Sequence, residues 1–166
     1  MLKWLWLSLV VIVLDQLTKY LATDLLVYAE PVAVIPFFNL TLLHNTGAAF
    51  SFLSDAGGWQ RWFFAVIAIV FSIGITIWLG RLDSKQRWLA IALSLVVGGA
   101  LGNLWDRLYF GYVVDFIQLY YEQWYWPAFN IADSAIFVGA VMLLIDGFFG
   151  NSSESEKDGP SGTVIQ

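Results

Sequence analysis

The sequence of 166 residues contains no cysteine and a single histidine, His44. The absence of cysteine excludes thiol nucleophiles, disulfides, iron–sulfur centres and thiolate zinc sites. One histidine cannot build a multi-histidine metal or haem site, and a Ser-His-Asp triad would have to use His44. Charged residues are also scarce, at 13%, and the net charge is −5. Nucleic acid requires a basic surface, so we expect no nucleic-acid partner.

Apolar side chains are what the chain has in abundance. Hydrophobic residues make up 59% of it, and its mean hydropathy of +0.70 is well above that of a water-soluble domain of this size. The 9 Trp, 7 Tyr and 13 Phe residues suit both a packed core and the two membrane–water interfaces. These features predict a membrane protein of one domain.

Four stretches are long and apolar enough to cross a hydrocarbon core of roughly 30 Å, which needs about 20 helical residues. They are Trp4–Thr23, Trp62–Leu79, Trp88–Trp105 and Ile131–Phe149. The predicted fold class is an all-α membrane protein with four transmembrane helices in a single domain of residues 1–150. Polar residues interrupt the first stretch and no small-residue cleavage site follows it, so we expect it to be retained and not removed as a signal peptide.

Basic residues indicate the orientation of these helices in the membrane. The short connection Gly80–Arg87 carries three cations, and Lys3 precedes the first helix. Short basic segments favour the cytoplasmic side, so we expect both ends of the chain to be cytoplasmic and the two longer loops to face outward. Residues Asn151–Gln166 have the composition of a disordered tail.

The two outer loops differ in composition. The first, Tyr28–Arg61, contains strand-like segments at Pro31–Pro36 and Phe38–Leu43 and a turn at Asn45–Gly47, so it predicts a small extracytoplasmic β-rich region. The second, Asp106–Asn130, is rich in tyrosine and tryptophan, which suit the membrane interface. We expect an aromatic outer loop there.

Polar residues within the helices are candidates for function, because an ionisable side chain in a span costs at least ~2.5 to 3.5 kcal/mol. Asp15 and Lys19 are spaced i, i+4 on the first helix and form either a structural ion pair or a contact with a ligand. Asn103, Asp106 and Arg107 share a face of the third helix, beside a small-residue surface of glycines. Either Asp106 and Arg107 pair locally, or Arg107 binds substrate carbonyls or orients a carboxylate.

Two further carboxylates fall at the outer ends of the third and fourth helices. Asp115 lies between apolar residues just outside the third helix. Asp133 lies in the first turn of the fourth helix, where Asn130 is a candidate N-cap and an acid is favoured by the helix dipole. The charged pair of the first helix reaches toward the same leaflet, so these groups predict one site. Asn45–Gly47 either adds amide hydrogen bonds to it or is only a turn.

Five short motifs follow one another along the chain. They are Asp15-Gln16-x-x-Lys19, Asn45-Thr-Gly-Ala-Ala-Phe, Gly99-x-x-Gly102-Asn103-x-x-Asp106-Arg107, Val114-Asp115-Phe116 and Phe129-Asn130-x-Ala132-Asp133-Ser134. In this order, and on four apolar helices, they resemble the motifs of the lipoprotein signal peptidases (signal peptidase II). The resemblance covers roughly residues 10–146 and no motif position departs from the pattern.

The resemblance implies an aspartic endopeptidase of the bacterial inner membrane. Such an enzyme removes the signal peptide from diacylglyceryl-modified prolipoproteins on the N-terminal side of the lipidated cysteine, so the implied partners are these substrates and membrane lipids. The family's two catalytic carboxylates match Asp115 and Asp133. Its supporting or substrate-binding positions match Asp15, Lys19, Asn45, Gly47, Asn103, Arg107 and Asn130. This chemistry requires neither a metal nor an organic cofactor.

Two other functions use the same residue types. A small proton-coupled transporter would also need acids and a lysine within the membrane, but here they cluster toward one leaflet and no inverted repeat is visible. A serine–lysine peptidase would pair Lys19 with a serine such as Ser8 or Ser51. The nearby carboxylate of Asp15 would keep Lys19 protonated and therefore a poor base.

Overall fold

Four long helices make up most of the computed structural model, which describes residues 1–47 and 58–149. After a 3-10 turn η1 (Leu2–Trp4), they are α1 (Leu5–Leu25), α2 (Trp59–Arg81), α3 (Arg87–Tyr109) and α4 (Ile131–Phe149). All four are long and apolar enough to cross a membrane, so the four predicted spans are confirmed. α3 continues past the predicted end at Trp105, and Asp106 and Arg107 are therefore helical. The predicted tail at 151–166 lies outside the described residues.

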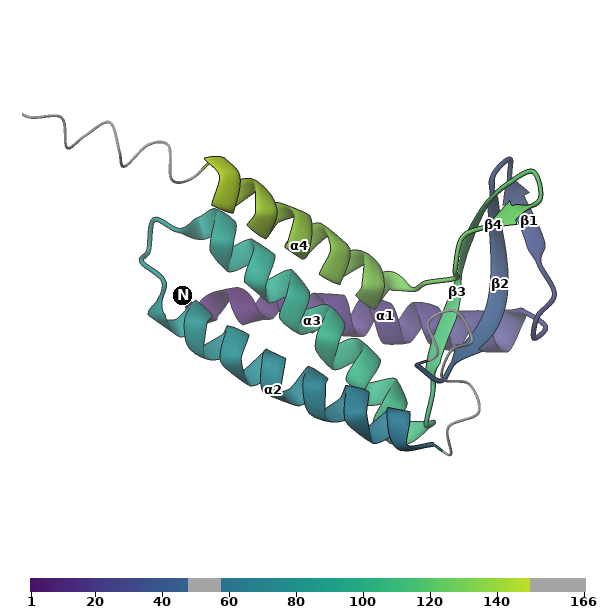
Figure 1. Ribbon diagram of the computed structural model, residues 1–166, viewed down its shortest axis with the longest axis horizontal. Coiled ribbons are helices and arrows are strands. Elements are labelled where there is room, and N and C mark those ends of the chain that lie inside the picture. The colour runs from purple at the N-terminus through teal and green to yellow at the C-terminus, as the bar shows by residue number, and fades with distance from the viewer. Residues whose placement is uncertain (48–57, 150–166) are drawn as a thin grey trace, which may run out of the picture.

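α3 is the central helix and contacts each of the other three (Figure 1). Glycines allow this close approach. A Cβ atom on Gly98 would lie 2.9 Å from the backbone of Ser8 in α1, and one on Gly102 would lie 2.8 Å from the Asp15 carboxylate. Gly99 lies directly against the carbonyl of Ala132 in α4. The predicted small-residue surface thus brings polar groups of α1 and α4 against α3.

The outward faces of the helices are apolar, as expected for contact with lipid tails. Large side chains such as Phe71, Phe137 and Phe148 are exposed on them. Inside the bundle, Leu79, Ala90 and Leu93 form a fully buried cluster near the α2–α3 connection. This cluster lies at the end of the bundle that also holds the N-terminus (Figure 1).

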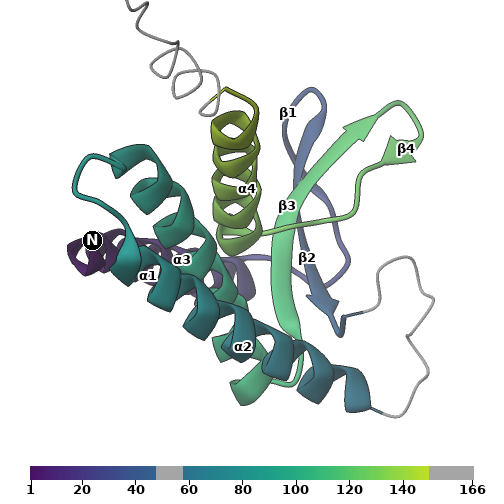
Figure 2. The same ribbon diagram turned by 60° about the vertical axis from the view of Figure 1, so that its left-hand side comes forward.

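A four-stranded antiparallel sheet lies at the opposite end of the bundle (Figures 1 and 2). Its order is β1 (Val32–Ile35), β2 (Phe38–Asn45), β3 (Val113–Tyr121) and β4 (Trp124–Tyr125). β1 and β2 confirm the predicted β-rich region. β3 and β4 occupy the segment interpreted as an aromatic loop, where apolar and aromatic residues favour a strand as much as an interface.

The pairing of β2 with β3 joins the α1–α2 and α3–α4 connections. Leu43 lies opposite Asp115, and Asn45 lies opposite Val113. The segment between α1 and α2 therefore lies beside the segment between α3 and α4, next to the ends of α3 and α4 where the candidate carboxylates were predicted.

Candidate active site

Asp133 is held at the start of α4 by a reciprocal pair of hydrogen bonds. Its backbone N–H donates to Asn130 Oδ1 at 2.9 Å, and the backbone N–H of Asn130 donates to Asp133 Oδ2 at 3.3 Å. This is the arrangement of a capping box, so Asn130 is the N-cap that the sequence predicted. The remaining oxygen, Oδ1, accepts a hydrogen bond of 2.7 Å from Asn103 Nδ2 on α3. Asp133 is half-buried, and these three hydrogen bonds fix its carboxylate against α3.

Asp115 lies on β3 and is only 2% exposed. Its Oδ1 accepts a hydrogen bond of 2.7 Å from Asn130 Nδ2, and its Oδ2 accepts one of 2.9 Å from Asn45 Nδ2. Burial and then the negative charge of Asp133 raise the pKa of Asp115 from 3.8 to about 7, although the two amide hydrogen bonds oppose this rise. Asp115 can therefore hold a proton near neutral pH.

Two asparagines connect the carboxylates to each other. Asn130 donates through Nδ2 to the carboxylate of Asp115 and through its backbone N–H to the carboxylate of Asp133. Asn103 donates to Asp133, while its Oδ1 accepts from Asn130 at 3.1 Å and from Lys19 Nζ at 3.0 Å. The side chains from α3, β3 and α4 thus form one hydrogen-bond network.

Asn45 reaches this network from a tight turn at the end of β2. Its Oδ1 accepts a hydrogen bond of 2.9 Å from the backbone N–H of Gly47. Gly47 has a φ of +95°, and a Cβ atom there would lie 2.6 Å from the ring of Phe64, so both conformation and space require glycine. The rest of this motif, Ala48–Phe50, lies outside the described residues.

A buried cluster of charges lies beneath the two carboxylates. Lys19 Nζ is 2.8 Å from Asp15 Oδ2 and 2.9 Å from Asp106 Oδ2, and the three side chains are 3%, 0% and 1% exposed. The predicted i, i+4 ion pair is confirmed. The alternative of a local Asp106–Arg107 pair is wrong, because α3 turns Asp106 toward α1. Gln16, which was not a candidate site residue, donates to Asp106 Oδ1 at 2.8 Å.

Arg107 lies at the edge of the site. Its Nη1 donates to the carbonyl of Asn103 at 3.2 Å, and its guanidinium carbon lies 5.3 Å from the ring centre of Phe64. It is close enough to Asp115 and Asp133 to interact with both electrostatically. Within the described part of the chain, its buried Nε has no hydrogen-bond partner. The guanidinium therefore retains donor capacity beside the carboxylates.

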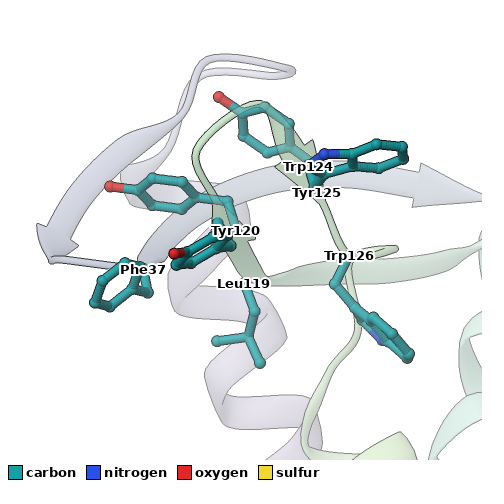
Figure 3. A pocket seen from close by; sticks show the side chains of 7 residues that line it. Phe37, Leu119, Tyr120, Trp124, Tyr125 and Trp126 are labelled. Carbon is teal, nitrogen blue, oxygen red and sulfur yellow. The ribbon is translucent and has the colours of Figure 1, made fainter.

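The site opens onto an apolar surface. A cavity of about 430 Å³ beside Asp133 is lined mainly by apolar side chains of β3, α4 and the segment before α4. It shares Leu119 and Trp126 with a second cavity of about 450 Å³, around which Figure 3 shows the aromatic side chains of the β3–β4 hairpin and Phe37. An apolar ligand can therefore approach Asp133 from the lipid side.

The structure does not form a serine–lysine pair at Ser8. Ser8 lies eleven positions before Lys19, about 16 Å along α1, and its hydroxyl donates to the carbonyl of Ser94 at 2.7 Å. Ser51 lies outside the described residues. His44, the only histidine, is exposed and stacks on Tyr112 at a ring distance of 4.0 Å. In the described ranges, no group of three or more acidic or histidine side chains is arranged to hold a metal ion.

Comparisons with known proteins agree over nearly the whole chain. The family model described as signal peptidase (SPase) II matches residues 7–149. The lipoprotein signal peptidase of Acinetobacter baumannii is 60% identical over 146 residues, which are 88% of this chain and 83% of the relative. The lipoprotein signal peptidase of Pseudomonas aeruginosa is 54% identical over 160 residues, which are 95% of each chain.

Two solved structures, both described as bacterial membrane enzymes, share the fold. One has a TM-score of 0.79 at 30% identity and covers 98% of this chain and 94% of its own. The other has a TM-score of 0.76 at 33% identity and covers 86% of this chain and 90% of its own. The arrangement of four helices and a terminal sheet is thus one already known among bacterial membrane enzymes.

Proposed function

Because the chain belongs to the signal peptidase II family and has that family's function as a lipoprotein signal peptidase, we propose that Asp115 and Asp133 are its catalytic residues. The protein is a protease, and these residues make it an aspartic one. The observation that carries the proposal is that Asn130 donates to both carboxylates, through Nδ2 to Asp115 and through its backbone N–H to Asp133, while the raised pKa of Asp115 lets it keep a proton. The relatives give no support to a transporter.

The proposed mechanism uses the two carboxylates as a coupled pair. Two nearby carboxylates cannot both be ionised cheaply, so they share one proton. The ionised member takes a proton from the water that attacks the scissile carbonyl, and the protonated member donates a hydrogen bond to the carbonyl oxygen. Proton transfer to the departing amine then completes hydrolysis. With a pKa of about 7, Asp115 is suited to hold the shared proton.

The substrates are prolipoproteins, and we propose that they carry a diacylglyceryl group on the cysteine after the cleaved bond. The lipid tails would stay in the outer leaflet, while the signal helix remains in the bilayer. The apolar cavity beside Asp133 supports this placement, because Phe137 and Val138 extend it onto the lipid-facing side of α4. The aromatic hairpin suits the adjoining interface.

We propose that the sheet and the catalytic pair face the periplasm. The basic residues of the α2–α3 connection and Lys3 lie at the other end of the bundle, which the positive-inside rule assigns to the cytoplasm (Figure 1). Reporter fusions after Leu82 and Gln166 should report cytoplasm, and those within residues 32–41 or at Tyr121 should report the periplasm. A cytoplasmic signal at Tyr121 would put the site in the wrong compartment.

The catalytic proposal is tested with purified protein in detergent and a diacylglyceryl-modified prolipoprotein, by following the shorter product on a gel. Asp115→Asn and Asp133→Asn should each abolish processing, since an amide of nearly the same shape cannot exchange the proton. The double variant should be no worse than either single variant, because the residues act as one unit.

Two controls accompany these variants. Ser8→Ala alters a buried hydroxyl far from the pair and should retain processing, and so should the wild-type protein in the presence of a chelator. Wild-type turnover by either aspartate variant would show that the two-aspartate mechanism is wrong. If the wild-type protein left the substrate intact but moved protons across the membrane of liposomes, the transporter function would replace the proposed peptidase function.

A further inference from the structure

The residue before each proposed catalytic aspartate is held by a buried carboxylate. The backbone N–H of Val114, which precedes Asp115, donates to Asp106 Oδ2 at 3.1 Å. The backbone N–H of Ala132, which precedes Asp133, donates to Asp15 Oδ1 at 2.9 Å. Two carboxylates from different helices thus make the same contact with the two segments that carry the proposed catalytic aspartates.

Lys19 joins these two carboxylates. Its ammonium group has three donors, and they meet Asp15, Asp106 and Asn103 at 2.8, 2.9 and 3.0 Å. Gln16 Nε2 makes a second bridge, at 3.2 Å to Asp15 Oδ2 and 2.8 Å to Asp106 Oδ1. An unbroken chain of contacts therefore runs from the Val114 amide through Asp106, Lys19 and Asp15 to the Ala132 amide.

We propose that Asp15, Lys19 and Asp106 form a positioning unit that sets the separation of the two catalytic carboxylates. The proposal rests on the catalytic role of Asp115 and Asp133. A peptide unit is planar, so a hydrogen bond to the N–H of Val114 or Ala132 also fixes the Cα atom of that residue. Each of these Cα atoms lies one residue before a proposed catalytic aspartate. Hydrogen bonds to a carboxylate that is paired with a cation are stronger than neutral ones, so carboxylates suit this task.

The composition of the unit follows from where it lies. Two carboxylates this deeply buried would repel each other and lose their hydration, and the ammonium between them offsets both effects. Gly102 leaves the space that Asp15 occupies, because a Cβ atom there would lie 2.8 Å from Asp15 Oδ2. An ion pair that served stability alone would have no need to use both amides adjacent to the catalytic residues.

The test compares turnover with stability in variants of Asp106. Asp106→Ala removes the acceptor for the Val114 amide, and a misplacement of about 1 Å can cost on the order of 100-fold in rate. We expect kcat for a diacylglyceryl-modified prolipoprotein to fall by about that factor, with KM within about twofold of wild type. Asp106→Asn keeps an oxygen that can accept from the amide, so its kcat should stay within about tenfold. Asp15→Ala should behave as Asp106→Ala does.

Leu93→Ala is the matched control. Leu93 is fully buried in the cluster at the far end of the bundle, so its truncation lowers Tm without touching the site. All rates are measured well below the Tm of each variant in the same detergent. Leu93→Ala should retain wild-type kcat, whereas Asp106→Ala should lose it.

Three results would overturn the proposal. They are a wild-type kcat in Asp106→Ala, a loss confined to KM, and an equal kcat loss in Asp106→Ala and Asp106→Asn, which would indicate a role for charge alone. If Asp106→Ala does not fold, Asp106→Ser replaces it, because its hydroxyl can bond to the helix carbonyl of Gly102 but is too short to reach the Val114 amide. An inactive Asp115→Asn beside a fully active Asp106→Ala refutes the positioning unit alone, whereas an active Asp115→Asn refutes the catalytic pair.

Discussion

Replacing Lys19 by methionine removes an ammonium group from between two carboxylates that are almost completely buried. Methionine has a similar length and fits an apolar helix, so the change affects mainly charge and hydrogen bonding. Asp15 and Asp106 would keep their bonds to Ala132 and Val114 but lose the cation that faces both of them.

The expected loss is large because solvent cannot replace the missing partner. Breaking a buried ion pair by removing one member costs about 3–5 kcal/mol. For a chain of this size, 1 kcal/mol shifts Tm by roughly 2–4 °C, so Tm should fall by about 6–20 °C. Thermal unfolding followed by tryptophan fluorescence in one detergent measures the shift, and Lys85→Met, on an exposed loop, should remain within about 1 °C of wild type.

A compensating variant separates charge from shape. The triple change Asp15→Asn, Lys19→Met and Asp106→Asn leaves the cluster neutral, and replacing a whole buried ion cluster by neutral groups is often close to neutral for stability. It should recover more than half of the lost Tm. A Tm of Lys19→Met within about 2 °C of the wild-type Tm would refute this prediction, because it would show that the ammonium does not neutralise these carboxylates in the folded protein.

Two further predictions concern the proposed catalytic pair and its neighbour. The folded chain holds the Asp115 proton more tightly than the unfolded chain does, so this stabilisation is complete below about pH 3.8 and is lost as pH rises through about 7. Between pH 5 and 8 the free energy of unfolding of wild type should therefore fall relative to that of Asp115→Asn by roughly 3 kcal/mol, because the pKa of about 7 lies about two units above pH 5 and each unit corresponds to about 1.4 kcal/mol. A constant difference would contradict the raised pKa. Arg107→Lys should lower kcat about tenfold or more, because an ammonium cannot both lie over Phe64 and donate in a fork; wild-type turnover would show that only charge matters there.

The helices could be predicted from apolar runs, but the strands of the second loop could not. The predicted third span ends at Trp105 because polar residues follow it in the sequence. In the structure α3 continues to Tyr109, and Asp106 has an ion-pair partner, Lys19, on α1. β3 was missed for a different reason. Its apolar and aromatic residues also suit a membrane interface, and its pairing with β2 is a long-range contact that no local pattern contains.

The candidate site shows the same division between local and long-range information. Topology alone predicted that Asp115 and Asp133 lie at one end of the bundle, and spacing alone predicted the Asp15–Lys19 pair. Asp106 pairs with Lys19 and not with Arg107 because α1 and α3 lie close together. The glycines of α3 allow this close approach, but it can be seen only once the helices are packed. Backbone donors such as the Val114 amide have no side-chain signature and cannot be found by motif.

The bond between Asp15 and the amide of Ala132 joins positions 117 residues apart, and this has a consequence for biosynthesis. Asp115 is translated before Asn130, which supplies one of its two amide donors, and before Asp133. Until the start of α4 has packed against α1 and α3, the two carboxylates are therefore not assembled into a pair. Chains that stop short of residue 130 should be proteolytically inert, so the membrane around an inserting polypeptide is exposed to its activity only after the last helix has docked.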